Sequence, residues 1–518
     1  MDTVKLKNVL RSEIEDLREA GHKFINGEMK MMDFKHKSGG FGVYAHRDGK
    51  SFMIRLRIPS GKTDLVELKK VYEFAKKYNM EKIHFTTRQA IQFHGLTIDE
   101  ICDLMKEALD VDIYTRGSGG NFPRNVALSP LAGVNPEEAF DPTPYALAVG
   151  NYFLERIYTY HLPRKLKVSF SSSKNDGAHC TIQDLGFLAV NENGKNYFRV
   201  YLGGGLGQNP RLAVKYPALI EPEKVLYYVE AMVKFFMAEG DYENRSKARV
   251  RYILDRMGED KFISEYGKYV EKELANGGMD INPEKVNYSK AGKETDIQSL
   301  RLYHQKQKGL YSVYLHPTGG QLKTEDLKKL IVELEKIQDV DIRLAMTEGV
   351  YIRNLNGDEA ADILKVTQPM GDETLVKQSV ACIGAPLCQI GMGNSQKLLR
   401  DIIGYLEDKN YNADLLPRIQ ISGCPNSCGI HQAGAIGFTG KKKKIGETIT
   451  DCFTLYVGGS FHANHPNIGK SYGEIPAEKI PELIYEIGKR LENKNIMFTE
   501  YMDKNEQELE LLINSYLV

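Results

Sequence analysis

The second half of this chain repeats the first, and no other feature restricts the fold as strongly. The segment from Phe52 to Gly95 has a weaker copy between Tyr311 and Asn354. Each copy begins with an alternating apolar strand, continues through a glycine-containing turn and an amphipathic helix, and ends in a second strand. The stretch from Ile342 to Leu355 matches that from Ile83 to Leu96 position for position. We call the first copy unit A and the second unit A′.

A second kind of unit follows each of these copies, and we call the two examples B and B′. Three motifs of unit B recur in unit B′ in the same order. Leu162-Pro163-Arg164-Lys165 corresponds to Leu416-Pro417-Arg418-Ile419, and Gly186-Phe187 corresponds to Gly437-Phe438. The third motif, Tyr201-Leu202-Gly203-Gly204, corresponds to Tyr456-Val457-Gly458-Gly459. The order A–B–A′–B′ is interrupted by a charged, helical connection over residues 221–300. This duplication predicts an α+β molecule with pseudo-two-fold symmetry, in which a site on the axis draws residues from both halves.

Four of the seven cysteines form two pairs in unit B′. Cys382 and Cys388 are separated by five residues, and Cys424 and Cys428 by three. Four thiolates can hold one [4Fe–4S] cluster. The alternatives are a structural zinc site, against which the five-residue gap counts, and unrelated buried cysteines. We expect the other three cysteines to be ordinary buried side chains: Cys102, Cys180 and Cys452.

The corresponding segments of unit B are rich in cations instead. Val380-Ala381-Cys382 aligns with Val126-Ala127-Leu128, and Leu416 to Cys428 aligns with Leu162 to Lys174. The latter segment contains four cations: Arg164, Lys165, Lys167 and Lys174. A metal centre in one half facing an anion-binding wall from the other is therefore predicted, and such a site suits the reduction of an oxyanion.

At these residues the chain closely resembles the siroheme-dependent sulfite and nitrite reductases. The resemblance rests on the four cysteines and on three further motifs, Thr86-Thr87-Arg88-Gln89 with Gln92-Phe93-His94-Gly95, Pro123-Arg124-Asn125, and Leu162 to Lys167. It implies a [4Fe–4S] cluster joined to siroheme through Cys428, which is then the axial ligand of the siroheme iron. It also implies that the open face of siroheme is lined by Arg88, Arg124, Lys165 and Lys167.

Siroheme carries many carboxylates, so further cations are expected at its rim. Arg164 is one candidate, and Lys247, Arg249 and Arg251 in the connection are others. The latter group also fits an exposed helical face. The glycine-rich Gly203 to Gly207 segment is predicted to be a structural turn, because Gln208 breaks the dinucleotide-binding pattern.

The resemblance divides the chain into six segments. They are an N-terminal helical extension (1–40), a ferredoxin-like half-domain (41–110), a mixed α/β siroheme-binding domain with the anion-binding cations (111–220), the helical connection (221–300), a second ferredoxin-like half-domain (301–370) and a second siroheme domain with the cluster cysteines (371–518).

The resemblance implies reduction of sulfite to sulfide by six electrons, or reduction of nitrite to ammonia. Nitrite reductases of this family typically have asparagine at the position of Lys167, whereas sulfite reductases have lysine, so sulfite is favoured. Against this, Asn125 to Val134 resembles the ferredoxin-dependent nitrite reductases equally well. The rival functions are a non-catalytic iron–sulfur electron carrier and a zinc-stabilised binding module.

Composition limits the partners. Lys+Arg and Asp+Glu both number 69, which argues against general nucleic-acid binding. No signal-peptide or membrane-spanning pattern is present, so we expect a cytoplasmic protein without a membrane partner. With no flavin or nicotinamide domain visible, electrons should come from ferredoxin or a flavoprotein. The Lys441 to Lys444 run is predicted at an exposed hairpin tip, with docking of an acidic carrier as the alternative.

Overall fold

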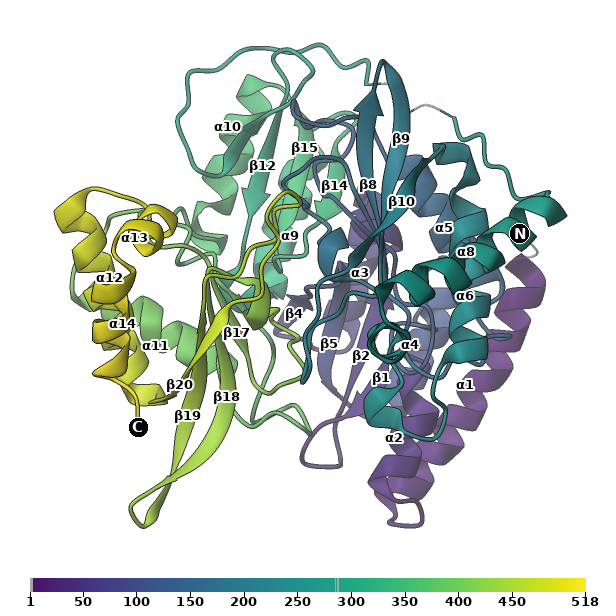
Figure 1. The fold of residues 1–518 in the computed structure, drawn as a ribbon, viewed down its shortest axis with the longest axis horizontal. Helices are drawn as coiled ribbons and strands as arrows, with labels where there is room; N and C mark the ends of the chain where they lie inside the picture. The colour runs from purple at the N-terminus through teal and green to yellow at the C-terminus, as the bar shows by residue number, and fades with distance from the viewer. Residues whose placement is uncertain (1–2, 285, 287) are drawn as a thin grey trace.

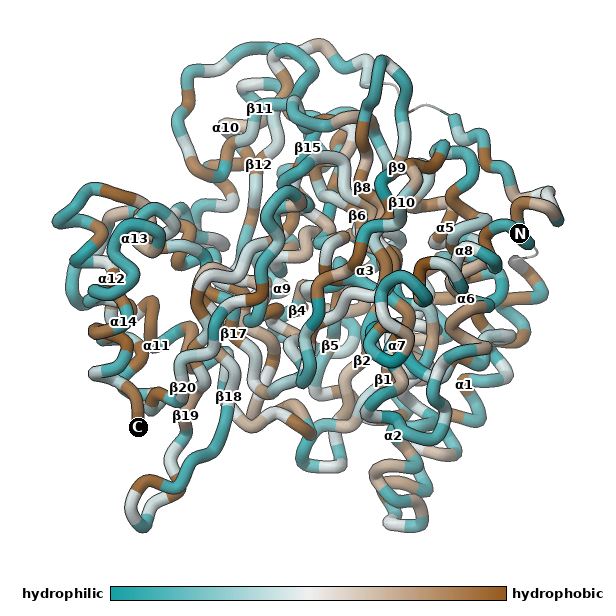
Figure 2. The backbone as a smooth tube through the Cα atoms, in the orientation of Figure 1, coloured by the Kyte–Doolittle hydropathy of each residue, from teal (hydrophilic) through white to brown (hydrophobic). Residues whose placement is uncertain are grey.

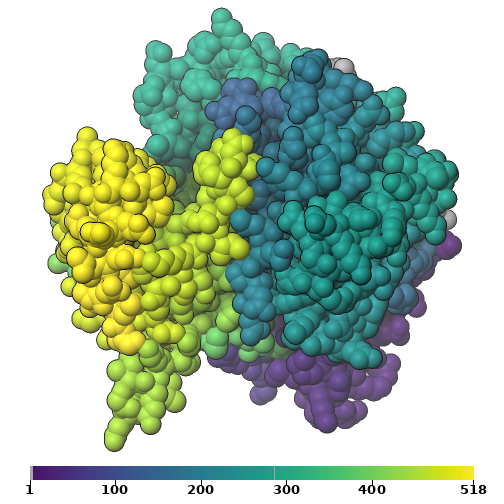
Figure 3. All heavy atoms as spheres, viewed as in Figure 1, coloured from purple at the N-terminus to yellow at the C-terminus, as the bar shows by residue number. Residues whose placement is uncertain are grey.

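The computed structural model describes residues 3–284, 286 and 288–518, and it confirms the duplicated α+β fold (Figure 1). The described residues form four five-stranded sheets, one for each predicted unit. The two halves lie side by side, so that unit B, drawn in blue, faces the yellow-green unit B′ across the molecule (Figure 3).

Units A and A′ have matching sheets. The strands of unit A are β1 (Val43–Ala45), β2 (Phe52–Arg57), β3 (Lys62–Thr63), β4 (Lys82–Phe85) and β5 (Ala90–Leu96). Those of unit A′ are β11 (Leu302–His304), β12 (Tyr311–Leu315), β13 (Gln321–Lys323), β14 (Asp341–Leu344) and β15 (Val350–Leu355). The sheet orders are β1-β2-β5-β4-β13 and β11-β12-β15-β14-β3.

These orders show that the two halves exchange a strand. In β13 of unit A′, Leu322 pairs antiparallel with Ile83 of β4, while in β3 of unit A, Thr63 pairs with Ile342 of β14. Each sheet is therefore completed by the other half. The sequence repeat predicted β2, a strand in the region of β4 and β5, and their copies in unit A′, but neither the exchanged strands nor their pairing.

Units B and B′ also match. The strands of unit B are β6 (Ala127–Leu128), β7 (Val168–Ser171), β8 (Leu185–Glu192), β9 (Lys195–Leu202) and β10 (Val214–Ile220). Those of unit B′ are β16 (Val380–Ala381), β17 (Ile419–Ser422), β18 (Ile436–Ile445), β19 (Thr448–Val457) and β20 (Lys470–Pro476). In each sheet the first three strands run parallel and the later pairs are antiparallel.

The predicted amphipathic stripes bury their apolar residues against these sheets. The helices of units A and A′ are α3 (Leu65–Lys77), α4 (Ile98–Asp110), α9 (Thr324–Leu334) and α10 (Gly357–Thr367). Those of B and the connection are α5 (Thr143–Glu155), α6 (Val225–Glu239), α7 (Val250–Met257) and α8 (Glu259–Asn276). Those of B′ are α11 (Ser395–Asp408), α12 (Ile480–Lys494), α13 (Phe498–Lys504) and α14 (Glu506–Asn514). Apolar residues gather along the inner strands and helix faces, whereas the rim is mostly hydrophilic (Figure 2).

The connection is less helical than predicted. Helix α8 ends at Asn276, and the described residues between it and β11 contain no helix or strand. Paired glycines at 277 and 278, both with positive φ, follow the last helical turn, and glycine in this conformation commonly ends a helix.

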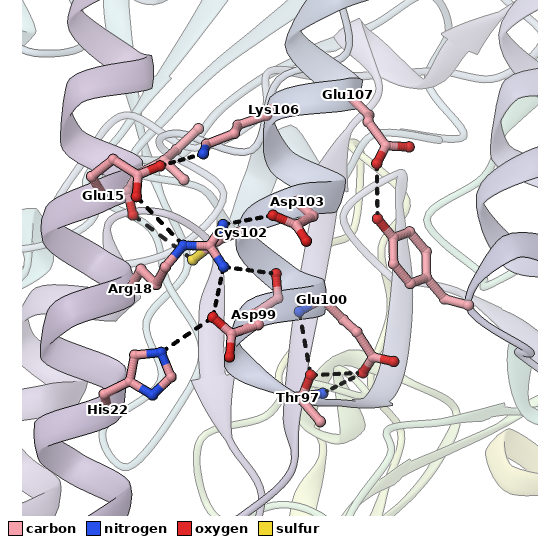
Figure 4. Close-up of polar contacts among 12 residues, drawn as sticks. Glu15, Arg18, His22, Thr97, Asp99, Glu100, Cys102, Asp103, Lys106 and Glu107 are labelled. Carbon is pink, nitrogen blue, oxygen red and sulfur yellow. Dashed lines mark hydrogen bonds and ion pairs between the residues drawn. The ribbon is translucent and has the colours of Figure 1, made fainter.

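The N-terminal extension is helical as expected, with α1 (Thr3–Ile25) and α2 (Met31–Gly39). Helix α1 lies along α4, where Arg18 donates to the carboxylates of Asp99 and Asp103 at 2.6 Å each (Figure 4). Leu10, Ile14 and other apolar residues of α1 join the main core beneath these ion pairs.

The lysine run lies on a strand of a protruding hairpin. Lys441 to Lys444 belong to β18, and the tip itself is formed by Gly446 and Glu447. Lys441 and Lys443 pair with Glu474, and Lys442 pairs with Asp451. Much of the positive charge is therefore neutralised locally, which weakens the docking alternative. No helix in the described part of the chain has the length and apolar content needed to cross a membrane.

Candidate functional site

The two cysteine loops start at the carboxyl ends of neighbouring parallel strands. Cys382 follows β16, and Cys424 and Cys428 follow β17. The loops are tied together because the amides of Met392 and Gly393 both donate to the Gly423 carbonyl at 2.8 Å. Parallel strands end at the same sheet edge, so this arrangement places all four sulfurs in one region.

Glycines allow the loops to approach so closely. A Cβ atom added at Gly423 would lie 2.8 Å from the Cα of Gly384, and Gly384 itself has a φ of 53°. A side chain at either position would push the loops apart.

The thiols lie close enough to influence one another electrically. Burial, together with the neighbouring Cys428 and Cys388 sulfurs, raises the pKa of Cys424 to about 11. Cys382 Sγ accepts a hydrogen bond from the Gly423 amide at 3.1 Å. Among the described residues no three His, Cys, Asp or Glu side chains are placed to hold a single metal ion. A structural zinc site needs its thiolates on one ion, whereas a [4Fe–4S] cluster takes each thiolate on a different iron.

Three of the four predicted anion-binding cations come from unit B, on segments that precede its parallel strands. Arg124 precedes β6, and Lys165 and Lys167 precede β7. Leu166 forms a parallel bridge with Pro123, which keeps these two segments side by side. The charge of Cys428 acts on the pKa of both Lys165 and Lys167, so the two ammonium groups lie within electrostatic range of this cysteine.

Arg88 joins the same group from unit A, although its local structure differs from the expected strand. It lies in the turn between β4 and β5, where Gln89 has a φ of 53°. Its guanidinium donates to the Val168 carbonyl at 2.8 Å and to the Gln183 side chain at 3.1 Å. In the same turn, the Thr87 hydroxyl donates to the Cys428 carbonyl at 2.8 Å and joins the two halves. We call Arg88, Arg124, Lys165 and Lys167 the cationic wall.

The register of the strands corrects the alignment of B with B′. Ala127 pairs with Ser169 as Val380 pairs with Gln420, so Ser129, and not Leu128, corresponds to Cys382. The hydrogen bonds agree, because Ser129 Oγ accepts from the Ser172 amide as Cys382 Sγ accepts from the Gly423 amide.

The second alignment was shifted by three residues. Strand β7 begins at Val168 and β17 at Ile419, so the cysteine loop after β17 corresponds to Ser173 to Gly177, a segment that contains Lys174 but none of Arg164, Lys165 and Lys167. Lys167 instead corresponds to Arg418. Arg124, Lys165 and Lys167 thus lie before the first two strands of unit B, whereas the cysteines lie after the equivalent strands of unit B′. The site therefore combines the amino-terminal edge of one sheet with the carboxyl-terminal edge of the other.

The equivalent site on the other side of the pseudo-two-fold is closed by aromatic side chains. Arg418 lies over the Tyr314 ring at 5.3 Å and donates to Gln378 at 2.6 Å. Tyr314 and Tyr351 are buried beside it, with ring centroids 4.5 Å apart. These rings pack beside Arg418, so protein side chains occupy its surroundings.

The candidate rim cations differ in burial and in their contacts. Buried Arg249 binds Asp184 with two nitrogens at 2.8–3.1 Å, and buried Arg251 lies against the glycine-rich segment. Arg164 is half-buried and donates to Asn121 at 3.4 Å. Lys247 is exposed, and no contact joins it to the others. Of this group, the structure therefore leaves Lys247 apart from the site.

The glycine-rich segment does more than turn the chain. A Cβ at Gly205 would lie 2.9 Å from Arg251 Nη1, and Gly207 exchanges two hydrogen bonds with the Gln432 side chain of unit B′. Its lack of side chains lets Arg251 reach the interface next to Pro425 of the cysteine loop. The sequence signal was the glycine run itself, which was interpreted only as a turn.

A polyanionic cofactor fits the charge of this region. Burial lowers the pKa of Arg88 to about 9, that of Arg124 to about 10 and that of Lys167 to about 7, and neighbouring cations act in the same direction. Asp184 is the acid that offsets them, and it is already bound to Arg249. The Nε atoms of Arg88, Arg124 and Arg251 have no hydrogen-bond partner in the described part of the chain. Buried, repelling cations with free donors are suited to carboxylates and a small oxyanion.

Comparisons with known proteins agree with this site. The family model described as nitrite and sulphite reductase 4Fe-4S domain matches residues 119–274 and 373–489, more than half of the chain. The model of the nitrite/sulfite reductase ferredoxin-like half domain matches residues 44–111.

Relatives named as nitrite reductases and relatives named as sulfite reductases are both similar to this chain. The chloroplastic ferredoxin–nitrite reductase of Arabidopsis thaliana is 27% identical, over 93% of this chain and 84% of its own. The NADPH sulfite reductase hemoprotein beta-component of Staphylococcus epidermidis is also 27% identical, over 80% of this chain and 77% of its own. The solved structure of the Mycobacterium tuberculosis NirA protein has the same fold, with a TM-score of 0.79 at 22% identity over 98% of this chain and 96% of that one. The chain therefore belongs to the nitrite and sulfite reductase family, whose cofactors are siroheme and a [4Fe–4S] cluster.

Proposed function

We propose that this protein is a sulfite reductase that converts sulfite to sulfide. In this proposal Cys382, Cys388, Cys424 and Cys428 would hold the [4Fe–4S] cluster, and Cys428 would also hold siroheme. When bound, the two cofactors would supply the electrons for the reduction. Arg164, Arg249 and Arg251 bind carboxylates at the siroheme rim.

The cationic wall binds and orients the anion. Arg88 and Arg124 offer planar guanidinium groups, which match oxyanions through paired donors. Lys165 and Lys167 provide compact charges and transferable protons. Each sulfite oxygen must leave as water, so proton delivery is needed at every stage of the six-electron reduction.

The observation that carries the proposal is the state of the two lysines. No hydrogen bond or ion pair engages the ammonium of Lys165 or Lys167 in the described part of the chain, although both groups lie within electrostatic range of Cys428. Because the pKa of Lys167 is lowered to about 7, chiefly by burial, it can give up a proton near neutral pH. Sulfite, with three oxygens to lose, makes more use of such a donor than nitrite does.

Nitrite reduction to ammonia at the same site is the second candidate, because nitrite and sulfite reductases are equally similar in sequence to this chain. A non-catalytic electron carrier would have no use for the cationic wall. Electrons would come from ferredoxin or a flavoprotein. Leu387 and Ile390, exposed by 37% and 46% beside Cys388, would give that carrier an apolar contact near the cluster.

The test is steady-state reduction of sulfite and nitrite by the purified holoenzyme with a dye as electron donor. We expect Lys167→Asn to lower kcat/KM for sulfite by about 100-fold, and that for nitrite by less than about tenfold, because general acid catalysis typically contributes about 10²–10⁴-fold. Lys174→Asn is the matched control, since Lys174 is exposed in the same unit. Equal losses on both anions in the Lys167 variant would contradict the assignment of sulfite.

A further inference from the structure

We propose that Tyr44 and Arg55 are positioning residues that orient Arg124 by holding the glycine loop Gly117–Gly120. The inference rests on the proposed function in one respect, that Arg124 binds the substrate anion. It adds a contact between unit A and the Gly117–Gly120 loop that none of the site motifs contains.

Arg124 is oriented by two backbone carbonyls of this loop. Its Nη1 donates to the Ser118 carbonyl and its Nη2 to the Gly120 carbonyl, both at 2.8 Å. Two parallel donors on two fixed acceptors define the plane of the guanidinium. They leave Nε without a partner among the described residues. The position of the loop therefore determines where the free donor points.

The loop is held in turn by two side chains of the neighbouring strands. The Tyr44 hydroxyl accepts a hydrogen bond from the Gly120 amide at 3.1 Å. Arg55 Nη1 donates to the Ser118 carbonyl at 2.7 Å, so this carbonyl serves Arg55 and Arg124 together. Each end of the loop that contacts Arg124 is thus fixed by one side chain of unit A.

The backbone packing of the loop leaves no room for it to shift toward α2. A Cβ at Gly119 would lie 2.1 Å from the Gly39 carbonyl oxygen and 2.6 Å from the Tyr44 hydroxyl. Gly120 has a φ of 64° and touches the backbone of Gly40. Such contacts require glycine, because any side chain would separate the two backbones.

Arg55 is itself held by the Gln92 side chain of the neighbouring strand. With the Gln92 amide oriented so that its nitrogen donates to His84 Nδ1, its oxygen accepts from Arg55 Nη2 at 2.6 Å and from Nε at 3.0 Å. His94 and His46 extend this buried network, with 3.1 Å between His46 Nε2 and His94 Nδ1. The network leaves Nη1 of Arg55 for the loop.

The electrostatics match these contacts. Burial alone would raise the pKa of the Tyr44 phenol, yet the guanidiniums of Arg124 and Arg55 bring the pKa below its usual value. The direction of this shift agrees with a phenol oxygen that lies near both guanidiniums and accepts from the Gly120 amide.

Tyr44→Phe in the holoenzyme tests the proposal, because it removes only the hydroxyl. We expect the KM for the anion and its dissociation constant from optical titration to rise about tenfold, with kcat changed less than about twofold. Hydrogen exchange of the peptide over residues 115–122 should also become faster in the cofactor-free protein. Tyr266→Phe is the matched control, since its buried hydroxyl donates to the Tyr228 carbonyl at 2.8 Å far along the chain from the loop.

Two results would overturn the proposal: unchanged exchange of the loop in Tyr44→Phe, or faster exchange with unchanged anion affinity. Measuring both anions separates this test from that of the proposed function. If the wild-type enzyme reduces nitrite and not sulfite, the sulfite assignment fails, while the effect of Tyr44 is still measured on nitrite.

Discussion

At the scale of single residues, the site depends on how few acids accompany its buried cations. Asp184 is fully buried and accepts from Arg249, and its second oxygen also accepts from the Lys167 amide at 2.8 Å. One carboxylate therefore stabilises a buried guanidinium and fixes the backbone of a cationic-wall residue. A lone aspartate has no distinctive spacing, which is why sequence reasoning missed it.

Asp184→Ala should lower the free energy of unfolding by about 3 kcal/mol, because Arg249 would remain buried without its partner. Urea unfolding of the cofactor-free protein measures this. Asp255→Ala, which breaks the half-exposed pair with Arg211, should cost less than about 1 kcal/mol. Equal losses in the two variants would show that Asp184 does not stabilise a buried cation.

At the scale of elements, helix α1 of the N-terminal extension packs along α4 of unit A. Arg18 of α1 reaches Asp99 and Asp103 of α4, and Thr97 caps α4 through a capping box with Glu100 (Figure 4). The extension continues into α2, whose last glycines contact the loop that holds Arg124. The packing of α1 is therefore linked, through α2, to the position of the loop that contacts Arg124.

Arg18→Ala should lower the free energy of unfolding by about 1 kcal/mol, since two ion pairs between elements are lost at a partly exposed position. Lys23→Ala is the control, because Lys23 pairs with Glu19 within α1 itself and should have a smaller effect. Thermal unfolding at low and high salt measures both. An effect of Arg18→Ala that does not weaken at high salt would contradict an electrostatic origin.

The elements also show where alignment of a sequence with itself fails. Units A and A′ have equal spacing, so their strands were predicted position for position. Units B and B′ contain insertions, and the resemblance of Leu162-Pro163-Arg164 to Leu416-Pro417-Arg418 gave a register three residues from the one in the sheet. The hydrogen-bond register of the two sheets shows which residues correspond, whereas short sequence motifs leave a shift of a few residues undetected.

At the scale of the molecule, the exchange of β3 and β13 makes each half depend on the other. Each A-type sheet includes one strand from the opposite half, and the cationic wall and cysteines meet across the same pseudo-two-fold. The halves are therefore not independent folding units, although they are copies.

A protease site inserted between Gly277 and Gly278 should be cleaved without separating the halves. The segment lies beyond α8 and belongs to no sheet, whereas both exchanged strands remain in place after cleavage. Size-exclusion chromatography of the nicked protein should give one particle of unchanged size, and denaturant should be needed to release the fragments. Separation under native conditions would contradict the structural role of the exchanged strands.

The sequence alone determined the duplication, the periodicity of the strands and helices, the four paired cysteines and the cations that face them. These are local properties, because hydrophobic period and residue spacing act over a few turns of chain. The tertiary structure decided the strand exchange, the opposite strand ends that form the site, the closure of the second site by Tyr314 and Tyr351, and the loop that orients Arg124. These depend on contacts between segments far apart in the chain, and the packing of the whole core selects those contacts.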